Sequence, residues 1–89
     1  MVNSGSSANL VMIESLKKYF GWKDGDEIIV CSCGFPTTVA PIVQCGLKPV
    51  FCDVELGTYV SSVDQVMSRV TEKTKMIILP NLIGSKPDW

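Results

Sequence analysis

Three short apolar runs recur along the chain, and none of them alternates cleanly between apolar and polar positions. They cover residues 27–31, 49–54 and 75–79. A strand with one face in water alternates, whereas a strand that is covered on both faces is apolar nearly throughout, as in parallel sheets. The pattern therefore predicts three strands of a parallel sheet.

Segments with helical spacing of apolar residues precede and separate these runs. Residues 9–20 predict the first helix, and Gly21 is placed to end it. Residues 37–45 predict a shorter helix that ends before Gly46, with Pro41 tolerated if it falls in the first turn. The apolar face expected for the first helix consists of Met12, Ile13, Leu16 and Phe20.

A third helix is expected over residues 62–70. Ser62 and Gln65 have the spacing of a capping box, in which each side chain bonds to the backbone of the other residue. The side chains expected to point inward are Val63, Val66, Met67 and Val70.

Helices and strands thus alternate, which predicts an α/β fold with three layers: a mainly parallel sheet with flanking helices. The sequence begins on a helix with no strand before it, and it ends at Trp89 directly after a loop. Of its residues, 46% are hydrophobic, which is more than a free-standing domain of 89 residues needs, because so small a domain has a large polar surface to cover. We therefore expect residues 1–89 to be one partial domain, truncated at both ends.

Charge and composition narrow the classes of function. The net charge is −1 and the basic residues are scattered, which argues against nucleic acid as a partner. The apolar runs are too short to span a membrane, and no signal peptide is evident, so the cytoplasm is the expected location. Four cysteines lack metal-site spacing and histidine is absent, so we expect buried thiols and no metal site.

The turn at residues 3–9 is the most informative stretch for chemistry. Small residues that lead into a helix leave backbone N–H groups unpaired at its positive end, where a phosphate can bind. Gly5 would let an anion approach the backbone, and the hydroxyls of Ser6 and Ser7 could add hydrogen bonds. An ordinary serine N-cap explains the same residues equally well.

Further candidates follow the strands, where ligands collect in open parallel sheets. Phe35 comes just after the first strand and could stack on a planar cofactor, or it could belong to the core. Asp53 after the second strand is more simply a loop-capping carboxylate, and Asn81 and Gly84 follow the third. No acid–base pair or nucleophile–histidine set can be assembled, so we expect no catalytic residue in this chain.

Taken together, seven segments in order and at matching spacing resemble the DegT/DnrJ/EryC1/StrS family of sugar aminotransferases and related dehydrases. Residues 3–10 (NSGSSANL) are similar to the phosphate-binding turn of that family, and the similarity covers essentially all 89 residues. The other segments are residues 25–30 (GDEIIV), 34–39 (GFPTTV), 49–54 (PVFCDV), 58–59 (TY), 71–76 (TEKTKM) and 84–88 (GSKPD).

The resemblance implies part of the large, cofactor-binding domain of a fold type I enzyme with pyridoxal phosphate at the interface of a homodimer. Gly5 and Ser6 would hold the phosphate through their backbone, with Ser7 as an additional contact, and Phe35 would stack on the ring. The implied reaction transfers an amino group, typically from glutamate, to a nucleotide-linked keto sugar for cell-surface polysaccharide or lipopolysaccharide.

Departures from the family leave alternatives open. The aspartate that pairs with the pyridine nitrogen and the lysine that binds the cofactor covalently are expected beyond Trp89, and Asn81 replaces the usual histidine. Residues 34–39 are closest to the branch that dehydrates sugars at C3, which uses pyridoxamine phosphate and a histidine in place of the lysine. Alternatives from other classes are a non-catalytic α/β module that binds an anion or nucleotide, and a structural fragment stabilised by its neighbours.

Overall fold

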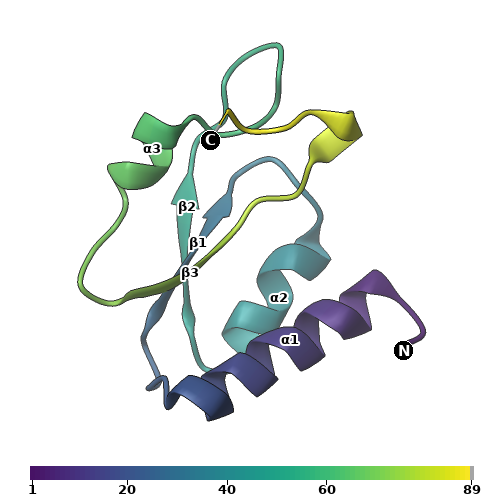
Figure 1. The fold of residues 1–89 in the computed structure, drawn as a ribbon, viewed down its shortest axis with the longest axis vertical. Helices are drawn as coiled ribbons and strands as arrows, with labels where there is room; N and C mark the ends of the chain where they lie inside the picture. The colour runs from purple at the N-terminus through teal and green to yellow at the C-terminus, as the bar shows by residue number, and fades with distance from the viewer. Residues whose placement is uncertain (89) are drawn as a thin grey trace.

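The computed structural model describes residues 1–88, so Trp89, the last residue of the expected domain, lies outside it. Helices and strands alternate in the predicted order (Figure 1). The elements are α1 (Gly5–Phe20), β1 (Glu27–Cys31), α2 (Pro36–Gln44), β2 (Lys48–Cys52), α3 (Val63–Met67), β3 (Thr74–Ile78) and a short 3-10 helix, η1 (Leu82–Gly84).

The three strands form one parallel sheet with β1 in the centre, in the order β2-β1-β3. Cys31 is in register with Cys52, and Ile29 with Ile77. The strand β2 ends at Cys52, before the predicted limit at residue 54. The amide of Val54 donates to the side chain of Asp53 at 2.8 Å instead of joining the sheet.

Helices cover both faces of β1, which confirms the three-layer α/β fold. Ile28 and Val30 point to one face and pack in a core with residues of α1 and α2. Ile29 and Cys31 point to the other face, where they pack with Val66 of α3. Figure 1 shows α1 and α2 together on one side of the sheet, with α3 on the opposite side. Burial on both faces explains why the strand sequence does not alternate.

The first helix begins four residues earlier than predicted, because Ser4 caps it and Gly5 to Ala8 complete its first turn. Gly21 ends it in the left-handed conformation, at φ 68°, as predicted. The predicted apolar face is partly wrong. Ile13 is fully buried, whereas Phe20 is 61% exposed and packs against Trp22 outside the core.

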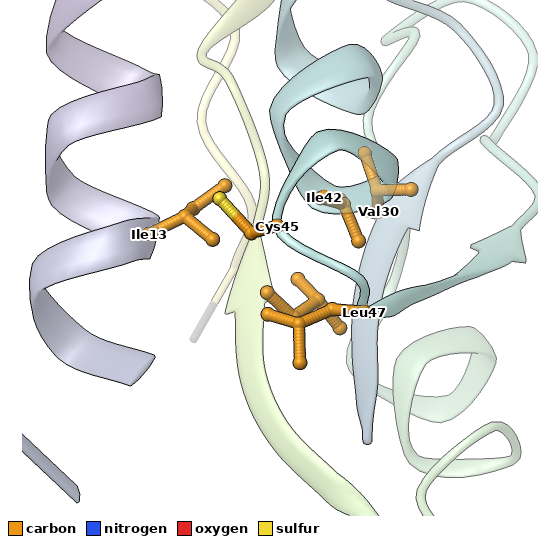
Figure 2. Packing of buried hydrophobic residues seen from close by; sticks show 6 residues of the cluster. Ile13, Val30, Ile42, Cys45 and Leu47 are labelled. Carbon is orange, nitrogen blue, oxygen red and sulfur yellow. The ribbon is translucent and has the colours of Figure 1, made fainter. Parts of the chain in front are cut away.

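Three residues on one face of α1 contact α2 at intervals of four positions. Asn9 donates to the carbonyl of Thr37 at 3.3 Å, and Lys17 donates to the carbonyl of Cys45 at 2.6 Å. Between them, Ile13 points toward Cys45 in the core (Figure 2). The earlier residue of α1 contacts the earlier residue of the α2 segment, and the later contacts the later, so α1 and α2 run in the same direction.

Pro41 does not lie in the first turn of its helix, so the condition under which it would cost little is not met. The helix α2 begins at Pro36, so Pro41 lies inside it, buried. A proline has no N–H to give to the carbonyl four residues earlier, which here is that of Thr37. That carbonyl accepts the side-chain amide of Asn9 instead.

The third helix has the predicted capping box but is shorter than predicted. Ser62 accepts from the amide of Gln65 at 3.2 Å, and the Gln65 side chain accepts from the amide of Ser62 at 2.8 Å. The helix ends at Met67 rather than near residue 70. Val66 is fully buried, but Met67 and Val70 are exposed, which corrects their predicted inward orientation.

The cysteines are free thiols, and three of them are buried, as expected. Burial raises the pKa of Cys31 and of Cys45, which disfavours the reactive thiolate. Among residues 1–88, no group of three or more histidine, cysteine or acidic side chains is placed to hold a metal ion. Within the same residues, no helix is long and apolar enough to cross a bilayer.

Glu27, at the amino end of β1, contacts β2 and the segment that precedes β3. The hydroxyl of Thr71 donates to the Glu27 carboxylate at 2.7 Å, and Lys48 lies 3.5 Å from it. The hydrogen bond from Thr71, together with the Lys48 charge, lowers the pKa of Glu27 below its ordinary value. A carboxyl whose pKa is lowered by folding stabilises the protein above its unfolded-state pKa, and that stability is lost as the pH falls.

We therefore expect Thr71→Val to raise the pKa of Glu27 and to lower the denaturant midpoint at pH 7. The difference from the wild type should shrink as the pH falls below about 4, where the carboxyl is protonated in the unfolded chain. Thr58→Val is the control, because Thr58 is exposed and its hydroxyl contacts only the carbonyl of Glu55. A midpoint difference that stays constant between pH 7 and pH 3 would contradict this role for Glu27.

Candidate functional site

The amino end of α1 leaves two backbone amides without a partner. Ser4 satisfies the next two, since its side chain accepts from the amide of Ser7 and its carbonyl accepts from that of Ala8. Within residues 1–88, no acceptor is in hydrogen-bonding position for the amides of Gly5 and Ser6. Acidic residues usually offset the positive end of a helix, but the first turn of α1 contains none. The helix therefore presents free donors and an uncompensated dipole to solvent.

Ser7 is more engaged than the sequence suggested. Its amide is used by the Ser4 cap, and its hydroxyl donates to the side chain of Asn3 at 2.7 Å. An anion at this turn would find the amides of Gly5 and Ser6 free, whereas the Ser7 hydroxyl would have to leave Asn3 to donate to it. The turn is therefore a serine N-cap that leaves two backbone amides free.

Gly5 is not required by the packing of the chain. A Cβ added there would meet no atom within 4 Å, and the residue does not have a positive φ. Neither a steric contact nor a left-handed conformation within the chain explains a glycine at this position. Close approach of a ligand to the backbone would explain it.

Phe35 lies where the chain leaves the carboxyl end of β1 and enters α2. It is the N-cap residue of α2, and its carbonyl accepts from the amide of Thr38 at 3.0 Å. Its side chain is 68% exposed, so it does not belong to the core. It lines a cavity of about 130 Å³ that Val30, Phe51 and Pro80 also line, beside the carboxyl end of the sheet. An exposed ring beside an apolar cavity can stack on a flat ligand.

The other candidates after the strands are arranged as loop residues. The carboxylate of Asp53 accepts from the amide of Val54, and its carbonyl accepts from the Ser61 hydroxyl at 2.6 Å. Asn81 is exposed at the start of η1, where its backbone carbonyl accepts from the amide of Gly84. Neither side chain lines the cavity beside Phe35.

The contact between Asn9 and Thr37 brings the two candidate regions together. Asn9 is one turn beyond Gly5, and Thr37 is two residues beyond Phe35, so this hydrogen bond joins the turn to the segment that carries the ring. Beside it runs a groove lined by Ser6, Ser7, Leu10, Thr37, Ala40, Pro41 and Gln44. The role of Asn9 was not evident from the sequence. A proline inside a helix signals a carbonyl that needs another donor, but the donor is evident only in three dimensions.

This arrangement suits a flat molecule that carries a phosphate. Two free amides at a helix end bind a dianion, and an exposed phenyl ring contacts an aromatic plane. Free amides and an exposed ring are features that bind and orient a ligand rather than transfer protons. The site therefore has the features expected of one part of a cofactor pocket.

Comparison with known proteins agrees with this geometry. The sequence is 48% identical over 89 residues to dTDP-4-dehydro-2,6-dideoxy-D-glucose 3-dehydratase of Saccharopolyspora spinosa, a match that covers 96% of this chain and 19% of that one. It is 31% identical over 84 residues to dTDP-4-dehydro-2,3,6-trideoxy-D-glucose 4-aminotransferase of the same organism, covering 94% of this chain and 21% of that one.

A solved structure shows the same fold. The GDP-4-keto-6-deoxy-D-mannose-3-dehydratase of E. coli, which has hydrated pyridoxal phosphate bound, matches with a TM-score of 0.84 and 41% identity. The match covers 93% of this chain and 22% of that one, so the chain spans about a fifth of the length of the relatives it matches. The sequence profile of the DegT/DnrJ/EryC1/StrS aminotransferase family matches residues 1–88. The chain belongs to that family.

Proposed function

We propose that residues 1–89 form part of the cofactor-binding domain of a longer enzyme that uses pyridoxal phosphate or pyridoxamine phosphate. Two observations support the proposal: the chain spans about a fifth of its relatives, and its free amides and exposed ring suit the cofactor. When bound, the cofactor supplies a ring that stabilises negative charge on a neighbouring carbon. The chain's own residues bind and orient it.

The amides of Gly5 and Ser6 would donate to the phosphate at the amino end of α1. A dianion is favoured there because the dipole of a sixteen-residue helix is not offset by any acid in its first turn. The Ser7 hydroxyl would add a third donor once it leaves Asn3. Phe35 would cover one face of the ring and keep water from it, since its side chain is already exposed beside the cavity.

The substrate of the intact enzyme is proposed to be a nucleotide-linked keto sugar, with glutamate as amino donor and a homodimer as the functional assembly in the cytoplasm. Removal of oxygen at C3 and transfer of an amino group are the two candidate reactions, and relatives of both kinds were found. Identity of 48% to a 3-dehydratase against 31% to an aminotransferase of the same organism favours 3-dehydration over the transamination that sequence analysis placed first. Another relative is a lipopolysaccharide biosynthesis protein of Salmonella typhimurium, and either product fits that process.

A product assay tests this proposal. The intact protein, expressed from its complete gene, is loaded with pyridoxal phosphate and incubated with glutamate and a dTDP- or GDP-linked 4-keto-6-deoxy sugar. Mass spectrometry should then detect a 3-deoxy sugar that forms only when cofactor and glutamate are both present. An amino sugar in its place would select transamination. Recovery of unchanged keto sugar under all conditions, with no cofactor bound, would contradict the proposed function.

A further inference from the structure

One backbone carbonyl inside α2 lacks its helical hydrogen-bond donor, and a side chain of α1 supplies a donor instead. Pro41 is buried in the sixth position of the helix and has no N–H, so the carbonyl of Thr37 lacks its helical donor. The side-chain amide of Asn9 donates to that carbonyl at 3.3 Å, from the second turn of α1. The hydrogen bond that α2 cannot make internally is therefore made to α1.

This bond lies between the two parts of the proposed cofactor site. On one side, Asn9 follows the free amides of Gly5 and Ser6 by one turn of α1. On the other side, Thr37 belongs to the first turn of α2, whose N-cap residue is Phe35. The second turn of α1 and the first turn of α2 are therefore joined by a side chain at the end where the ligand would lie.

The other polar contact between the two helices cannot replace it. Lys17 reaches the carbonyl of Cys45 two turns further along, at the opposite end of both helices. Ile13 packs between these two hydrogen bonds. Without Asn9 the helices would stay attached at Ile13 and Lys17, while their amino ends could separate.

We propose that Asn9 is a positioning residue for the cofactor: it supplies the donor that Pro41 lacks and so fixes the spacing between the phosphate-binding amides and Phe35. This inference rests on the proposed function. It assigns Asn9 no contact with the cofactor. Its effect passes through Thr37 and the first turn of α2.

The test is a double-mutant cycle between Asn9 and Pro41 in the intact protein, with pyridoxal phosphate as the probe. Asn9→Ala should weaken cofactor binding on the order of tenfold, because it removes the hydrogen bond that holds the amino ends of α1 and α2 together. It should also reduce the visible circular dichroism of the bound cofactor at saturation. Pro41→Ala provides a backbone N–H for Thr37 within α2 but no bond to α1, so the Asn9→Ala/Pro41→Ala double variant should regain stability and yet bind the cofactor as weakly as Asn9→Ala.

Gln44→Ala is the matched control, since Gln44 lines the same groove from α2 but is exposed and should leave cofactor affinity unchanged. Equal affinity of wild type and Asn9→Ala would overturn the inference alone. Recovery of wild-type affinity in the double variant would also overturn it, because the hydrogen bond between the helices would then not be the cause. A wild-type protein that binds no pyridoxal phosphate would overturn the proposed function, and this inference with it.

Discussion

Replacement of Ser6 by aspartate is expected to weaken the binding of pyridoxal phosphate by about a hundredfold. Ser6 is exposed at the amino end of α1, beside the two free amides, so a carboxylate there would face the phosphate. Two like charges about 5 Å apart interact by roughly 3 kcal/mol at an effective dielectric constant near 20, which is about a hundredfold in affinity. Titration of the apoenzyme with cofactor, followed by absorbance, measures the change.

The matched control is Ser6→Asn, because the asparagine side chain is nearly the same size as that of aspartate but carries no charge. An acid in the first turn of a helix stabilises it by about 0.3–1 kcal/mol, so the aspartate should not unfold the protein. The two variants should therefore have similar denaturant midpoints and very different affinities for the cofactor. Similar affinities for both variants would show that the phosphate does not bind at this helix end.

Replacement of Ile13 by alanine is expected to lower the free energy of unfolding by about 2–5 kcal/mol. Ile13 is the one residue of α1 with no exposed surface, and it packs with Cys45, Ile42 and Leu47 beneath α2 (Figure 2). Removal of its outer carbons would leave a cavity at the centre of the contact between the helices. Because α1 carries the free amides, cofactor affinity should fall as well. Denaturant unfolding of the intact protein measures the first effect.

Val11→Ala is the control for this prediction. Val11 lies two residues away on the same helix and is 53% exposed, so its replacement should change stability by no more than about 0.5 kcal/mol. Equal losses at both positions would mean that α1 does not dock through Ile13.

The strands and the layers could be predicted from sequence because burial on both faces of β1 leaves a direct trace in its residues. Ile28 and Ile29 point to opposite cores, so neither position admits a polar residue. The ends of the elements were less predictable, because they depend on single side chains. The Ser4 cap extends α1 toward the amino end. The strand β2 ends early, where the amide of Val54 donates to the side chain of Asp53.

The predicted inward faces were too wide for a different reason. Helical spacing identifies which apolar residues share a face, but not how much of that face a neighbour covers. Ile13 and Val66 meet the sheet cores, whereas Phe20, Met67 and Val70 lie beyond the edges of those contacts and stay exposed. The extent of coverage depends on where each helix crosses its neighbour, which is a tertiary property.

In the candidate site, the sequence indicated the turn and the ring but not what connects them. Small residues before a helix predicted free amides. The position of Phe35 after a strand allowed either a stacking ring or a core residue, and its 68% exposure decides against the core. The hydrogen bond from Asn9 to Thr37 joins residues 28 positions apart, and it depends on the placement of α1 beside α2. No local pattern contains that information, although Pro41 marks the carbonyl that needs it.

The most direct test of this account is a crystal structure of the intact protein with pyridoxal phosphate bound. The account predicts phosphate oxygens within about 2.7–3.2 Å of the amide nitrogens of Gly5 and Ser6, with the pyridine ring against Phe35. A cofactor whose phosphate is held elsewhere, with these two amides facing solvent, would contradict it.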